Sequence, residues 1–183
     1  MISRFVVVGT LAAVCGLLGG GFARAAQVDV NEQQVRAWNR FSEALLTLHK
    51  QQLNGREIRK TEESGRYGGE MAKNYSYKDI EYYDAKSGRL LSRVRWDGDK
   101  PEVYHTVEVH VYDGAGQLVR DFTSMYLPWA RNAPIRTFIN LHRHADDLHA
   151  FRQFDASGNR LYEQCKGRLS GEALEISLDF SDI

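Results

Sequence analysis

The chain contains one stretch with helical periodicity, followed by a much longer stretch with the alternation of β-strands. After Asn31, apolar residues recur at steps of three or four until Asn54-Gly55, a pair that is typical of a helix end. These apolar positions are Val35, Trp38, Phe41, Leu45 and Leu48. Asn31 also stands three residues before Gln34, as in a capping box. We predict one amphipathic helix over about residues 31–54, with its apolar side packed on a sheet.

From Arg56 onward, apolar and polar residues alternate with a period of two, which is typical of strands with one solvated face. The alternation is clearest over 103–112 and 174–180. Further candidate strands cover 56–63, 74–83, 89–96, 117–127, 135–144, 148–154 and 160–168. We predict an antiparallel meander of eight or nine strands over about 56–180. Together with the helix, it predicts an α+β domain in which a curved sheet, a half-barrel or cone, packs on the helix.

Three connections in this region have the same pattern, an Asp followed three or four residues later by a Gly. They cover 84–88, 113–116 and 155–158. The Asp side chain can accept backbone N–H groups, and the Gly can supply the positive φ of a tight hairpin. Over about seven residues each, they resemble the turns of YD repeats in secreted wall and toxin-shell proteins. Their unequal spacing predicts three hairpin turns in one sheet rather than a repeat array.

The first 25 residues have the pattern of a secretory signal peptide. Arg4 precedes the uncharged segment 5–22, and Ala23-Arg24-Ala25 places small residues where a signal peptidase cleaves. We expect cleavage near Ala25, leaving a single domain over 26–183 that is periplasmic or secreted and has no stable membrane span. The alternative is an N-terminal membrane anchor, although 18 uncharged residues are at the lower limit of a span and five of them are Gly.

Charge and cysteine content narrow the possible functions. Without the first 25 residues the chain has 22 basic and 24 acidic side chains, a net charge of −2. Nucleic-acid binding is not expected, because it normally needs a basic face. Cys165 would be the only remaining thiol, so an internal disulfide is excluded and the core must stabilise the domain.

Three histidines near a predicted hairpin tip are the strongest candidates for metal chemistry. If Asp146-Asp147 forms the tip, His144 lies opposite His149, and His142 shares their face. Three imidazoles with a carboxylate such as Asp146 are ligands that Zn²⁺ or Cu²⁺ uses. A metal-binding protein or a metal-dependent hydrolase is therefore one hypothesis. The alternative is a polar hairpin tip that binds no cofactor.

Aromatic residues suggest binding instead. Tyr75, Tyr77 and Trp96 could line a cavity or groove together with Trp129. Trp129 and Arg131 also lie in a loop between two prolines, which is typical of an interaction loop. The alternative is that these rings form ordinary cross-strand pairs.

The chain contains none of the usual catalytic signatures. It has no Gly-x-Ser-x-Gly elbow, phosphate-binding glycine loop, Cys-x-x-Cys or His-Glu-x-x-His motif. We therefore expect a non-enzymatic exported domain of the bacterial envelope that binds a small molecule, a glycan or an envelope protein. Besides the metal hypothesis, a structural envelope component recruited through a strand edge or Cys165 is a third possibility.

Overall fold

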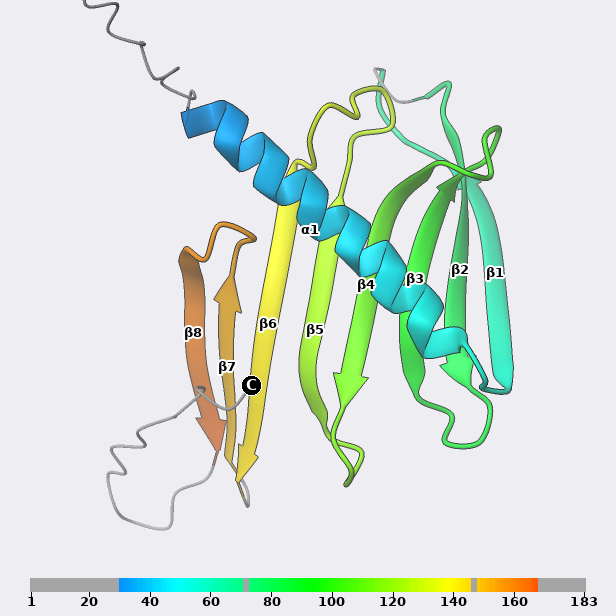
Figure 1. Ribbon diagram of the computed structural model, residues 1–183. Coiled ribbons are helices and arrows are strands. Elements are labelled where there is room, and N and C mark those ends of the chain that lie inside the picture. The colour runs from blue at the N-terminus through cyan, green and yellow to red at the C-terminus, as the bar shows by residue number, and fades with distance from the viewer. Residues whose placement is uncertain (1–29, 71–72, 146–147, 168–183) are drawn as a thin grey trace, which may run out of the picture.

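The protein is one helix packed on an open sheet (Figure 1), as seen in a computed structural model that describes residues 30–70, 73–145 and 148–167. Helix α1 spans Val30–Leu53 and crosses the sheet diagonally. The strands are β1 (Ile58–Arg66), β2 (Ser76–Asp84), β3 (Leu90–Asp97), β4 (Tyr104–Tyr112), β5 (Leu118–Met125), β6 (Arg136–Ala145), β7 (Leu148–Phe154) and β8 (Arg160–Gly167). The predicted α+β architecture is confirmed. The expected signal peptide and the ninth strand over 174–180 lie outside the described residues.

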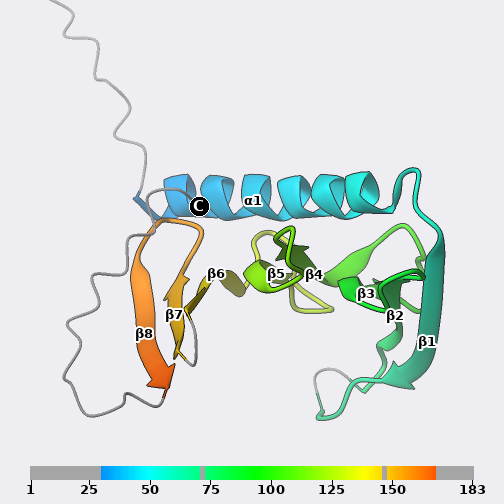
Figure 2. The same ribbon diagram turned by 90° about the horizontal axis from the view of Figure 1, so that it is seen from below.

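The eight strands form an antiparallel meander in which every strand pairs with its neighbours in the sequence. Figure 2 looks along the central strands. There the two edge strands, β1 and β8, turn away from α1. This arrangement is the strong twist expected of an antiparallel sheet. The sheet is not closed into a barrel, so the predicted half-barrel or cone is correct only in the coarser sense of a twisted sheet under one helix.

The hydrophobic core lies between α1 and strands β2 to β5. Its buried members are Leu45 on the helix, Tyr82, Val94, Tyr104, Val107 and Val109 on the strands, and Tyr126 directly after β5. Phe41 and Leu48, predicted on the apolar side of the helix, pack against this cluster. The helical periodicity therefore identified the side of α1 that packs on the sheet.

Hydrogen bonds also join α1 to the sheet, which the apolar pattern did not predict. The Ser42 hydroxyl lies 3.0 Å from the Tyr104 hydroxyl and accepts a hydrogen bond of 2.9 Å from Ser124. His49 Nδ1 lies 2.8 Å from the Ser92 hydroxyl, and His49 is only 4% exposed. Burial, with a smaller contribution from two nearby lysines, lowers the pKa of His49 to about 4. The helix is thus held in one position by directional bonds as well as by apolar contacts.

The three predicted hairpin turns have the expected geometry. Gly88, Gly116 and Gly158 have φ angles of 71°, 85° and 84°. The preceding aspartates, Asp84, Asp113 and Asp155, accept backbone N–H groups inside their own turns. This agreement supports the interpretation of three hairpin turns in a single sheet.

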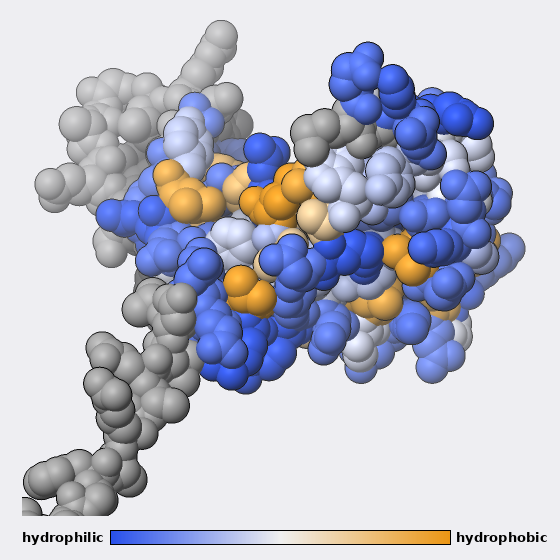
Figure 3. Space-filling view, turned by 90° about the horizontal axis from the view of Figure 1, so that it is seen from above, coloured by the Kyte–Doolittle hydropathy of each residue, from blue (hydrophilic) through white to orange (hydrophobic). Residues whose placement is uncertain are grey.

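The surface at the end of the sheet that carries the β5–β6 loop is mostly hydrophilic, with a short apolar band near its middle (Figure 3). The large apolar or aromatic side chains that the structure leaves exposed are Trp129, Ile135, Leu161 and Tyr162. No helix among the described residues is both long and apolar enough to cross a membrane.

Candidate functional site

The face of the sheet that points away from α1, here called the helix-free face, carries mostly polar side chains. On β2 and β3, Asp79 accepts hydrogen bonds from Arg93 at 2.8 Å and from Arg95 at 3.1 Å. Burial alone would raise the pKa of Asp79, but the two guanidinium groups hold it below its usual value. This half of the face is a set of ion pairs between neighbouring strands.

The other half of the helix-free face carries the predicted histidines. The β6–β7 register pairs Ala145 with Leu148, His144 with His149, and His142 with Phe151. The predicted hairpin register is therefore confirmed, and the three histidines share one face. They are joined there by Asp121 of β5, and these four residues are called the imidazole cluster below.

The imidazole cluster is a hydrogen-bonded stack. His142 Nε2 lies 2.6 Å from Asp121 Oδ2, and because a carboxylate only accepts, this nitrogen carries the proton. In the neutral ring His142 Nδ1 is then the acceptor, and it lies 3.0 Å from His149 Nε2. The rings of His142 and His149 are nearly parallel, 5.2 Å between centroids, and His144 stacks on His149 at 4.6 Å.

This arrangement differs from the geometry expected of a preformed metal site. Three ligands must direct lone pairs at one point, whereas His142 Nδ1 is already engaged with its neighbour in the stack. Within the described ranges, no group of three His, Cys, Asp or Glu side chains is placed to hold one ion. Asp146, the predicted carboxylate ligand, lies outside the described residues, and Asp121 was not predicted.

The residues predicted to bind a ligand through aromatic contacts are divided among several places. Trp96 packs in the core beneath α1, against the ring of Tyr104. Tyr77 lies on the helix-free face, where the Arg95 guanidinium is 4.2 Å from its ring centroid. Tyr75 and Trp129 are brought together, with centroids 6.2 Å apart. Arg131 donates to the Tyr104 carbonyl and covers the Tyr126 ring, so its contacts are with the core.

A different aromatic site lies beside the imidazole cluster, on β7 and β8. A pocket of about 260 Å³ is lined by His149, Phe151, Tyr162 and Gln164. The rings of Phe151 and Tyr162 have centroids 6.0 Å apart, and Tyr162 is 49% exposed. We call these four residues the aromatic pocket. Alternation along 148–154 and 160–168 and the predicted meander could have placed them on one face of two neighbouring strands, but the register that sets Phe151 beside Gln164 was not predicted.

No protein family, no curated protein and no solved structure matches this chain.

Proposed function

We propose that this chain is a non-enzymatic binding domain that works in the bacterial envelope after export, and that it binds its ligand in the aromatic pocket. The observation that carries this proposal is the combination of two aromatic rings with an amide and an imidazole around one pocket of about 260 Å³. Pockets that bind small molecules are typically lined by aromatic groups with a few polar side chains that fix the orientation of the ligand.

The side chains of the aromatic pocket suit a glycan. A sugar ring has an apolar side of C–H groups and a polar edge of hydroxyls. The rings of Phe151 and Tyr162 can contact the apolar side, while the Gln164 amide and the Tyr162 hydroxyl can bond the edge.

The test is a titration of the chain from Ala26 onward with tri-N-acetylchitotriose. Binding is monitored by calorimetry and by tyrosine fluorescence. We expect saturable binding that is weakened about tenfold or more by Tyr162→Ala, since central aromatic contacts often dominate binding energy. Leu161→Ala is the matched control, because Leu161 is adjacent, equally exposed at 49%, and does not line the pocket. Equal binding by wild type and Tyr162→Ala would show that the ligand is held elsewhere.

A metal-binding function remains the second candidate, and one specific contact favours it. The Asp121 carboxylate fixes the tautomer of His142, as carboxylates do for histidine ligands in metal sites. Rotation of His149 out of the stack would free the Nδ1 lone pair of His142 for Zn²⁺ or Cu²⁺. Elemental analysis of the untagged chain decides between the candidates. Metal near one equivalent, lost in the double variant His142→Ala/His144→Ala, would favour the metal.

The edge strand β1 argues against a structural role in which the chain pairs with another protein through a strand edge. This strand is exposed over most of its length, and its exposed residues include Arg59, Lys60, Glu62 and Glu63. Charged side chains on an edge strand oppose pairing with another sheet. Export itself is tested by N-terminal sequencing of the chain recovered from the periplasm, where Ala26 is expected as the first residue.

A further inference from the structure

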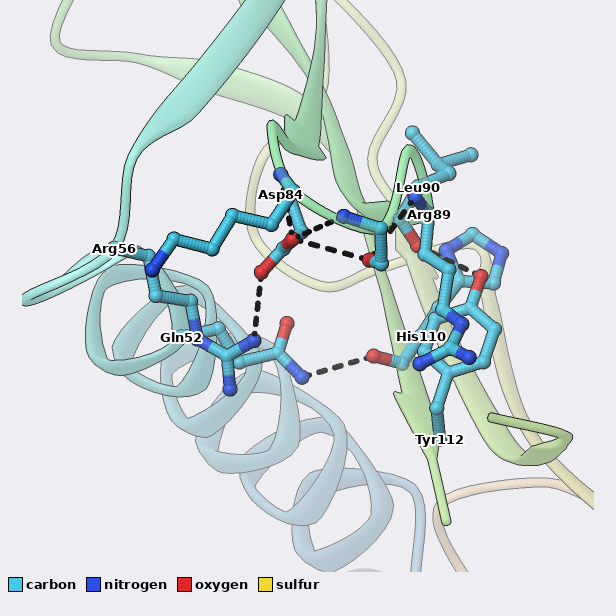
Figure 4. Close-up of polar contacts among 9 residues, drawn as sticks. Gln52, Arg56, Asp84, Arg89, Leu90, His110 and Tyr112 are labelled. Atoms are coloured by element: carbon cyan, nitrogen blue, oxygen red, sulfur yellow. Dashed lines mark hydrogen bonds and ion pairs between the residues drawn. The ribbon is translucent and has the colours of Figure 1, made fainter. Parts of the chain in front are cut away.

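A second pocket lies at the other end of the helix, and its side chains have a different chemistry. It is formed where the last turn of α1 meets the β2–β3 turn and the end of β4, and its volume is about 370 Å³. Its polar side chains include Gln52, Arg56, Asp84, Lys86, Arg89 and Tyr112. We call it the end pocket. Figure 4 shows the Gln52 amide between the Arg56–Asp84 pair on one side and Arg89 with Tyr112 on the other.

The Gln52 amide presents an unused acceptor. Its Nε2 donates to the His110 carbonyl at 2.8 Å, and only the NH₂ end of an amide can do so. Oε1 is therefore fixed as the atom on the other side of the amide. This oxygen is buried and has no hydrogen-bond partner. Buried acceptors without a donor are rare in native proteins, so the position calls for an N–H or O–H group.

The rim of the end pocket is cationic. Arg56, Lys86 and Arg89 line it together with two carboxylates, Asp84 and Asp113, which leaves an excess of one positive charge. Asp84 is already engaged, since Oδ1 accepts the N–H of Ser87 and Oδ2 lies 3.3 Å from Arg56. Lys86 and Arg89 form no ion pair with any residue in the part of the chain that the structure describes.

The walls of the end pocket are fixed by contacts with the sheet. The Tyr112 hydroxyl donates to the Leu90 carbonyl at 2.9 Å, which holds the ring across the ends of β3 and β4. The Arg89 guanidinium lies over that ring, 5.6 Å from its centroid. A preorganised wall of this kind lowers the entropic cost of binding a ligand.

We propose that the end pocket binds a small hydroxylated anion, that is, a phosphate ester or carboxylate that also carries hydroxyl groups. Gln52 Oε1 is closed to solvent in this conformation. A small shift of the Gln52 side chain toward the pocket lets a ligand hydroxyl supply the donor that Oε1 lacks. The anionic group lies against Arg89 and Lys86, whose charges favour phosphate and carboxylate alike. The volume of about 370 Å³ is that of a small-molecule site. This site is separate from the aromatic pocket and goes beyond the proposed function.

Four probes that separate charge from hydroxyl groups test this site by calorimetry at low salt. Glycerol 3-phosphate and glycerate carry both features, ethyl phosphate carries only the charge, and glycerol carries only the hydroxyls. We expect binding of at least one of the first two, with the other probes at least fivefold weaker. The pair of hydroxylated anions shows whether phosphate or carboxylate is preferred, and the side-chain amide resonance of Gln52 is expected to shift on binding.

Variants locate the binding. Gln52→Met is expected to weaken the hydroxylated anions about fivefold to tenfold and to leave ethyl phosphate unchanged. Gln51→Met is the matched control on the neighbouring exposed position. Arg89→Gln changes an exposed side chain and should not disturb folding, so it tests the site even if Gln52→Met unfolds the chain. It is expected to weaken the binding of every anion about tenfold. Absence of binding, equally tight ethyl phosphate, or an equal effect of Gln51→Met would overturn the proposal.

Discussion

Acid should destabilise this fold through His49, in a pH window that the structure defines. The imidazole is buried under α1 with a pKa of about 4, whereas its unfolded value is 6.5. The unfolded chain therefore takes up a proton at a higher pH than the folded chain. The contribution of neutral His49 to the free energy of unfolding is fully present above about pH 6.5 and is lost as the pH falls from 6.5 toward 4. Below about pH 4 this group causes no further loss.

The size of the effect follows from the two pKa values. Between pH 7.5 and pH 4.5, preferential protonation of the unfolded chain removes roughly 2–3 kcal/mol from the free energy of unfolding. The assay is urea denaturation at intervals of half a pH unit, with a single midpoint and slope fitted at each pH.

The matched variant is His49→Asn, which keeps a polar atom near the position of Nδ1 and does not titrate in this range. The pKa of His105 is also lowered by burial, but His105 titrates in both proteins and cancels when the two curves are subtracted. We expect the free energy of unfolding of the wild type, minus that of the variant, to fall by roughly 2–3 kcal/mol from pH 7.5 to pH 4.5. A difference that stays constant across this range would refute the assignment of a buried, neutral His49.

Further predictions concern the core, a turn and an ion pair. Leu45→Ala removes a side chain that is 3% exposed and should cost roughly 3 kcal/mol in urea denaturation, whereas the exposed Lys50→Ala should cost less than about 0.5 kcal/mol. Asp155→Ala should lower the free energy of unfolding by roughly 2 kcal/mol, and by more than Asp113→Ala does. Asp155 is buried and also accepts a hydrogen bond from the Asn159 side chain, whereas Asp113 is exposed. Equal losses in the two variants would contradict this. Asp79→Asn should cost about 1–2 kcal/mol at pH 7, measured as a lower thermal midpoint, and this difference should shrink below pH 3.8 as the carboxylate of the wild type is protonated.

The fold could be predicted from the sequence because each element carries its own local signal. The helix is predicted by spacing and capping, and the β6–β7 hairpin by the alternation on both sides of its tip. That alternation was sufficient to place His142, His144 and His149 on one face. Such predictions need only the conformation of a short segment.

The missed features depend on contacts between distant segments. Asp121 meets His142 across 21 positions of sequence, and the end pocket joins the last turn of α1 to β4. The predicted meander makes β5 and β6 neighbours, but neither their register nor the position of α1 on the sheet was predicted. The polar contacts beneath α1 were missed for another reason. Ser42 and His49 occupy buried positions that an apolar pattern leaves out, because a polar group is buried only where a partner such as Ser92 meets it.

The order of elements along the chain also sets an order of events in folding. All sheet contacts join sequence neighbours, so each hairpin can form as soon as its two strands exist, without closing a long loop. Helix α1 is the exception, because it comes first in the chain but packs on β3 to β5. In a chain that emerges from its N-terminus, the α1 segment therefore stays undocked until the core residues as far as Tyr126 have appeared. The apolar side of α1 lacks its partner strands throughout that interval, and exposed apolar surface of this kind favours aggregation until the helix docks.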